Sequence, residues 1–135
     1  MTIEIRGLAP LLEVFDMPIS LAFYRDTIGF DLVQDSGQGD NSGWVMLRLN
    51  DATLMLNTAY DEGERPPAPE PDWKTRHADG AIYFGCPNVD TAYDHLRAKG
   101  VDLNPPEITQ YGFKLIQVTD PDGYKLCFHW PGNEQ

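Results

Sequence analysis

The sequence predicts an α+β fold in which one strand–helix–strand unit occurs twice. Residues 11–30 read LLEVFDMPISLAFYRDTIGF, which is a short apolar strand, a turn, a helix and a closing glycine. Residues 82–101 read IYFGCPNVDTAYDHLRAKGV and show the same order, offset by 72 residues when Asp16 is aligned with Asn88. A duplicated unit of this size predicts two matching modules, and a groove between curved sheets is a natural ligand site.

The first copy begins with a predicted strand at residues 8–15, followed by a helix. Asp16 is a suitable N-cap, and Pro18 falls in the first turn, where a missing N–H costs little. Apolar residues recur at helical spacing as far as Gly29, which ends the helix in the left-handed conformation that glycine tolerates. A second strand is expected at residues 30–34.

A polar, glycine-rich loop at residues 36–43 separates this strand from a predicted hairpin. Residues 44–49 and 52–58 are strand-like, and Asn50-Asp51 between them is typical of a tight turn.

The second copy repeats the order. Residues 81–86 are strand-like, and Asn88 is a candidate N-cap for a helix that ends at Gly100. Residues 113–119 and 124–130 then form a final predicted hairpin, joined by the strong turn signal Asp-Pro-Asp-Gly.

Between the copies lies a proline-rich segment, residues 61–79, which we interpret as a linker. It joins modules at about residues 4–60 and 80–131, within a single domain of residues 1–135. Trp73 is isolated in this polar segment. It either pins the linker to the core or to a partner subunit, or forms a lid over a ligand.

Composition narrows the function further. The formal net charge of −11 disfavours nucleic acid and anionic membranes as partners and could attract a cationic ligand. No apolar run is long enough to span a bilayer, and the N-terminus lacks a signal-peptide pattern, so we expect a cytoplasmic protein. Cys86 and Cys127 lie in strand-like runs and are expected to be free thiols.

Three segments carry a family resemblance: AFYRDTIGF, NVDTAYDHLRAKGV and DPDGYKLCF. Together they resemble the vicinal oxygen chelate superfamily, which includes glyoxalase I, extradiol dioxygenases, fosfomycin-resistance enzymes and bleomycin-resistance proteins. The resemblance covers essentially the whole chain. It implies two βαβββ modules in tandem, with curved mixed sheets around a cleft, and usually a homodimer.

Catalytic members of the superfamily usually hold a divalent metal ion with His, Gln or Glu at four strand positions. The resemblance places these positions at Ala9, Met55, Ala81 and Cys127. Alanine offers no donor atom, and thioether or thiol ligands suit soft metals rather than Mg²⁺, Mn²⁺ or Fe²⁺. We therefore expect no metal, no cofactor and no catalytic residues.

The opening APLLEVFDMPISLAFY is similar to the metal-less, bleomycin-resistance branch. That likeness implies a dimer that sequesters an aromatic, often cationic, natural product or drug without changing it. Strand alternation extends a cleft lining from the four positions, with either Trp44 or Val45 and either Phe113 or Lys114 facing the cleft. The candidate ligand-binding residues are Glu13, Trp44, Met55, Asn57, Trp73, Tyr83, Phe113, Cys127 and His129.

Two alternatives remain open from the sequence. One is a lyase, isomerase or dioxygenase-like enzyme that uses unusual residues such as His129 or Glu13. The other is a structural or regulatory module that uses only its dimer surface. The residues at the candidate cleft could also be ordinary core.

Overall fold

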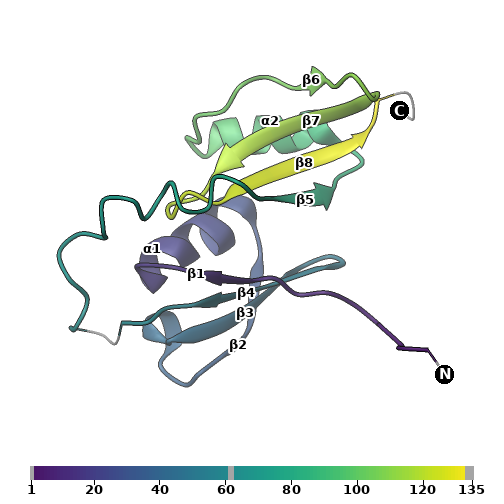
Figure 1. Ribbon diagram of the computed structural model, residues 1–135. Helices are drawn as coiled ribbons and strands as arrows, with labels where there is room; N and C mark the ends of the chain where they lie inside the picture. The colour runs from purple at the N-terminus through teal and green to yellow at the C-terminus, as the bar shows by residue number, and fades with distance from the viewer. Residues whose placement is uncertain (1, 61–62, 133–135) are drawn as a thin grey trace. The chain divides into compact units, whose positions relative to one another are not determined.

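The computed structural model describes residues 2–60 and 63–132 (Figure 1). The chain divides into two compact units, Met1–Pro69 and Glu70–Gln135, and each holds a four-stranded mixed sheet with helical segments. The predicted α+β fold of two tandem βαβββ modules is confirmed. That the two units make up one domain stays a prediction. Over the described residues, no helix combines the length and apolar character needed to cross a bilayer.

The first unit has the order β1 (Leu11–Glu13), α1 (Met17–Leu21), the π-helical segment η1 (Ala22–Ile28), β2 (Asp31–Asp35), the short 3₁₀ turn η2 (Gly39–Asn41), β3 (Trp44–Leu49) and β4 (Ala52–Asn57). The strand order in the sheet is β1-β4-β3-β2. β1 runs parallel to β4, and the remaining pairs are antiparallel.

Local chemistry explains where these elements begin and end. The Asp16 carboxylate accepts a hydrogen bond from the backbone N–H of Ile19, so it caps α1 as expected. Gly29 ends the helix at φ 115°, a left-handed conformation that suits glycine. Asn50 adopts φ 52° in the two-residue turn between β3 and β4, where asparagine is well tolerated.

Two sequence predictions for this unit need correction. The helical stretch is α-helical only as far as Leu21 and then widens into η1, which keeps the predicted apolar face buried. The first strand was predicted over residues 8–15 but is hydrogen-bonded only at Leu11–Glu13. Apolar alternation predicts a longer strand, but the bonds to β4 reach back only to Pro10, whose carbonyl accepts from the backbone N–H of Met55 over 2.9 Å. The preceding arm, residues 2–8, is exposed.

The first unit's core lies between its sheet and helix. One face of the strands and one face of the helix supply it: Leu12, Val14, Leu21, Tyr24, Val45, Leu47, Leu54 and Leu56 are buried. Every second strand residue therefore faces the helix, and the intervening residues line the other face, which we call the helix-free face of the first sheet.

The second unit has the order β5 (Ala81–Gly85), α2 (Val89–Ala98), β6 (Glu107–Ile108), β7 (Phe113–Thr119) and β8 (Lys125–Pro131). The strand order is β5-β8-β7-β6, so the second sheet repeats the connectivity of the first. The short strand β6 was not predicted from the sequence pattern. Asn88 caps α2 by accepting from the backbone N–H of Thr91 over 3.1 Å.

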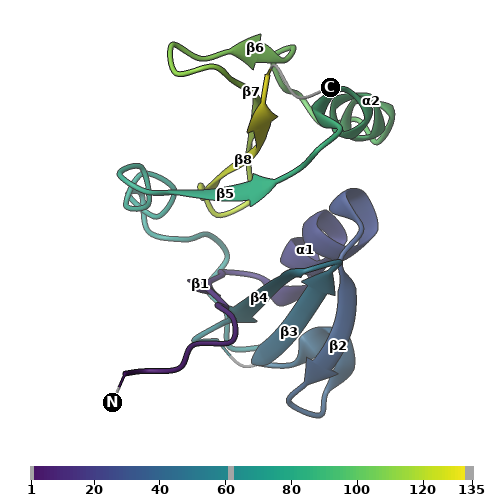
Figure 2. The ribbon, with the colours of Figure 1, turned by 90° about the vertical axis from the view of Figure 1, so that its right-hand side faces the viewer.

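α2 lies against β7 and β8 on one side of this sheet (Figure 2). The side chains on that side form the core, which includes Val89, Leu96, Ile116, Val118, Leu126 and Phe128. The opposite side is the helix-free face of the second sheet.

The role of residues 61–79 as a linker stays a prediction. Residues 70–80 form a series of turns that belongs to the second unit, with Gly80 leading directly into β5. Residues 61–62 of the predicted linker lie outside the described part of the chain. The segment from Glu70 onward packs on the turn between β7 and β8, where the Trp73 indole N–H donates to Asp122. It also contacts the start of β8, where Lys125 donates to the backbone carbonyl of Ala78 over 2.7 Å.

Candidate functional site

The helix-free face of the first sheet brings together four of the predicted site residues. Trp44 is paired with Asn57 across β3 and β4, and Glu13 on β1 is paired with Asn57 from the other side. The Asn57 amide donates to the Glu13 carboxylate over 2.8 Å. Met55 lies one position further along the same face, flanked by Leu11 and Met46.

This face therefore offers a half-buried indole, two flexible thioethers and the Glu13 carboxylate, and it also carries Arg48 with Asp31 opposite it. The register places Trp44 on this face, whereas Val45 is fully buried in the core. The arrangement suits contact with a ring-containing molecule that also carries a hydrogen-bonding or positive group.

On the helix-free face of the second sheet, three predicted residues form an aromatic cluster. The imidazole of His129 stacks on the ring of Phe113, with centroids 5.0 Å apart and an interplanar angle of 23°. Tyr83 meets the same imidazole edge-on, also at 5.0 Å. Tyr111 extends the cluster and lies 5.8 Å from Phe113. Phe113, and not Lys114, thus faces this side.

Cys127 lies beside the cluster, paired with Tyr83 across β5 and β8. Its side chain is 1% exposed, and its Sγ lies 3.8 Å from Oε1 of Gln117 on β7. Burial raises the pKa of the Cys127 thiol, and hydrogen bonding with that thiol raises the pKa of Tyr83. Both groups are therefore neutral donors at physiological pH, and Cys127 lacks the lowered pKa of a reactive thiol.

Trp73 lies away from the aromatic cluster. Its indole N–H donates to Asp122 in the turn between β7 and β8, and the Arg76 guanidinium lies 4.9 Å from its ring. These contacts match the interpretation of Trp73 as an anchor for the linker.

The four family metal positions do not suit a hard divalent cation. Met55 and Cys127 offer only sulfur, and Ala9 and Ala81 offer no side-chain donor. Within residues 2–60 and 63–132, no group of three His, Cys, Asp or Glu side chains is arranged to hold a metal ion.

Three residues on these faces were not predicted from the sequence. Gln117 adjoins Cys127, Met46 adjoins Met55, and Tyr111 adjoins Phe113. Gln117 and Met46 could have been found by applying strand alternation to the middle strands β7 and β3. Tyr111 precedes its strand, so periodicity gave no signal for it.

The family described as the glyoxalase/bleomycin resistance protein/dioxygenase superfamily matches residues 9–128. The chain belongs to this superfamily. The match spans both units, in agreement with the repeated strand order of the two sheets.

The chain is similar to proteins named bleomycin resistance proteins. The chain is 26% identical to a bleomycin resistance protein of Geobacillus stearothermophilus over 136 aligned positions, which cover 88% of this chain and 92% of the relative. The same values hold for a bleomycin resistance protein of Staphylococcus aureus.

Solved structures show the same fold. TnmS3, an antibiotic binding protein from Streptomyces sp. CB03234, has a TM-score of 0.71 with 23% identity, covering 97% of this chain and 98% of that one. A bleomycin-binding protein complexed with bleomycin has a TM-score of 0.70 with 19% identity, covering 93% and 98%. At these identities the likeness establishes the fold of this superfamily member.

Proposed function

We propose that the protein is a metal-independent binding protein that sequesters an aromatic or cationic natural product or drug. The aromatic cluster around His129 is the observation that carries this proposal. Tyr83 remains 49% exposed and Tyr111 67% exposed, so ring surface is available to a ligand. A flat ligand gains both apolar contact and favourable ring geometry on such a surface.

Charge favours a positively charged or polar-substituted ligand. The chain carries a formal net charge of −11, which raises the local concentration of cations. On the first sheet, Glu13 places a carboxylate in the same row as Trp44. An indole face and a nearby carboxylate are the groups that attract an aromatic cation.

Sequestration without chemistry is supported by the character of the polar groups. The Cys127 thiol is buried, with a raised pKa, and its hydrogen-bonding neighbours Gln117 and Tyr83 are not general bases. The residues at the four family metal positions lack hard donors. Relatives named for bleomycin resistance and bleomycin binding support the same class of ligand.

The proposal includes a cytoplasmic homodimer that binds neither nucleic acid nor membrane. Two free thiols, Cys86 and Cys127, fit a reducing compartment. The strongly negative charge disfavours polyanionic partners. The exposed apolar side chains of Ile3, Ile5 and Leu8 on the N-terminal arm suit burial against a second copy.

The direct test is calorimetric titration with metal-free bleomycin and a panel of other cationic aromatic antibiotics. Saturable binding is expected, and Phe113→Ala and His129→Ala should each weaken it by about 2 kcal/mol, the loss typical of a hot spot. Tyr93→Phe on α2 is the matched aromatic control and should bind as the parent does. Absence of binding by every compound in the panel would overturn the proposal.

Elemental analysis after purification without chelator tests metal independence. One equivalent of a divalent metal that is lost on replacing His129, and kept on replacing His77, would favour the enzyme alternative.

A further inference from the structure

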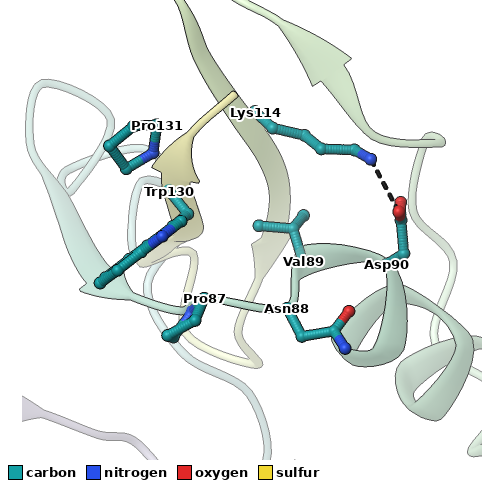
Figure 3. Close-up of a pocket in the computed structure, with 7 residues that line it drawn as sticks. All are labelled: Pro87, Asn88, Val89, Asp90, Lys114, Trp130 and Pro131. Atoms are coloured by element: carbon teal, nitrogen blue, oxygen red, sulfur yellow. Dashed lines mark hydrogen bonds and ion pairs between the residues drawn. The ribbon is translucent and has the colours of Figure 1, made fainter. Parts of the chain in front are cut away.

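A pocket lies on the opposite side of the second sheet from the aromatic cluster. Its volume is about 390 Å³, which falls within the range of small-molecule sites. It opens between β8, β7 and the start of α2 (Figure 3). The lining residues are Pro87, Asn88, Val89, Asp90, Lys114, Trp130 and Pro131.

One side of the pocket is apolar and consists mainly of side chains that contain rings. Figure 3 shows Trp130 with Pro131 and Pro87 on this side and Val89 at the base. Val89 is 3% exposed, which makes the base a fixed part of the core. Trp130 is half-buried, so part of its indole borders the pocket. A planar ring is the shape that best contacts an indole and two proline rings.

The other side carries two opposite charges. Nζ of Lys114 lies 2.7 Å from Oδ2 of Asp90, with side-chain exposures of 21% and 61%. An ammonium has three N–H donors and a carboxylate has two oxygens, so both groups keep capacity for further hydrogen bonds. A ligand with charge of one sign meets a like charge on this wall. A zwitterion presents the matching charge to each partner.

We propose that this pocket binds a free aromatic α-amino acid. The ring lies against Trp130 and the prolines, the α-carboxylate accepts from Lys114, and the α-ammonium donates to Asp90. The site is separate from the aromatic cluster around His129, because Trp130 and His129 are neighbours on one strand and point to opposite faces.

The test uses phenylalanine as the probe, with calorimetry and ¹⁵N spectra of the indole N–H groups. Saturable binding is expected to move the Trp130 resonance and to leave that of Trp44 in place. Trp130→Leu should weaken binding at least about tenfold. Trp130→Phe keeps a ring and is the second variant if the leucine variant is unstable. No saturable binding, or a shift of Trp44 alone, would overturn the assignment.

The charge pair allows a sharper test. Phenylpropionate keeps only the carboxylate and phenylalanine methyl ester keeps only the ammonium, so the parent should bind each at least about tenfold more weakly than phenylalanine. Asp90→Asn should improve phenylpropionate binding, and Lys114→Gln should improve binding of the ester. Equal affinity of the parent for the three compounds, or no improvement in the two variants, would disprove recognition of a zwitterion. Ile19→Ala, on α1, is the inert control.

This proposal and the proposed function can fail separately. Saturating phenylalanine should leave bleomycin affinity unchanged if the two ligands occupy different faces. Mutual displacement would place both on one site and remove the second site.

Discussion

The indole Nε1 of Trp73 donates a hydrogen bond to Oδ1 of Asp122 over 2.8 Å. Asp122 is 3% exposed and lies in the turn between β7 and β8. The two residues are 49 positions apart, so the bond ties the segment before β5 to the far end of the last hairpin. Trp73 therefore holds the turns of residues 70–80 against a defined part of the second unit.

Replacing Trp73 with phenylalanine should lower stability with little effect on ligand binding. The ring is kept, but the buried Asp122 carboxylate loses a donor, and hydrogen bonds to charged groups contribute about 1.5–3 kcal/mol. Chemical denaturation of Trp73→Phe measures the loss. Trp44→Phe is the matched control and should unfold close to the parent. A Trp73→Phe protein that keeps its stability and loses bleomycin affinity would favour the lid interpretation.

Gly123→Ala should destabilise the protein more than Gly37→Ala. Both glycines have positive φ, 93° and 108°, so both alanine variants carry similar backbone strain. A Cβ on Gly123 would also lie 2.1 Å from the backbone oxygen of Lys74, whereas Gly37 has open space around it. Strain alone costs about 1–2 kcal/mol. Equal melting temperatures for the two variants would show that the approach of Lys74 contributes nothing.

His77 should make stability fall as the pH drops below about 6.5. Its ring stacks on Tyr124 at 3.9 Å, and its buried Nε2 has no hydrogen-bond partner among the residues that the structure describes. Burial lowers the pKa of His77. The negative charge of Asp122 partly offsets this effect, and the positive charge of Arg76 lowers the pKa further. The unfolded state then binds a proton first, so stability is full above the unfolded pKa and declines as pH falls toward the folded pKa.

Melting temperatures measured across this pH range test the effect. His77→Phe should keep the stacked ring and show a flatter decline, and His95→Gln on α2 is the control. An unchanged slope in His77→Phe would assign the acid sensitivity to other groups.

Trp44→Ala should weaken ligand binding by about 2 kcal/mol while largely keeping the melting temperature. The side chain lies on the helix-free face of the first sheet and is not part of the core. Leu54→Ala gives the opposite pattern, because it removes a fully buried side chain and should cost about 2–5 kcal/mol of stability. Our assignment of Trp44 fails if its variant melts several degrees lower and binds ligand normally.

Removing residues 2–8 should weaken the proposed homodimer. Ile3, Ile5 and Leu8 are 87%, 78% and 81% exposed, and a stable interface buries more than about 1,000 Å². Light scattering at tens of micromolar, where the full chain is expected to be dimeric, compares the two forms. Polar substitution of Tyr93 on α2 is the control. A monomeric parent protein would contradict the dimer itself.

The fold could be predicted from the sequence because caps, glycines and turn residues marked nearly every boundary. Asp16, Asn88 and Gly29 act as expected at helix ends. The short strand β6 escaped detection, since two residues are too few to show alternation. The widening of the helix after Leu21 was also missed, because its apolar spacing fits either helix type.

The site could be predicted as far as strand alternation reaches. Trp44, Asn57 and Glu13 share one face, and Tyr83, Phe113 and His129 share another, because residues in register on neighbouring strands face the same side. The environment of Trp73 could not be predicted, since its partner Asp122 is distant in sequence and loops carry no periodicity. By the same alternation, Trp130 shares the side of α2 with Leu126 and Phe128.

The register between first and last strands sets the order in which each sheet can be completed. Leu11 on β1 pairs with Met55 on β4, and Ala81 on β5 pairs with Lys125 on β8. In both pairs the two residues are 44 positions apart in the sequence. Each opening strand must wait for the later hairpin to be made before it finds a neighbour, and such long closures slow folding. During synthesis, β1 stays unpaired until β4 has left the ribosome. The two units therefore fold in succession, and in each unit the sheet is completed when its first strand pairs with its last.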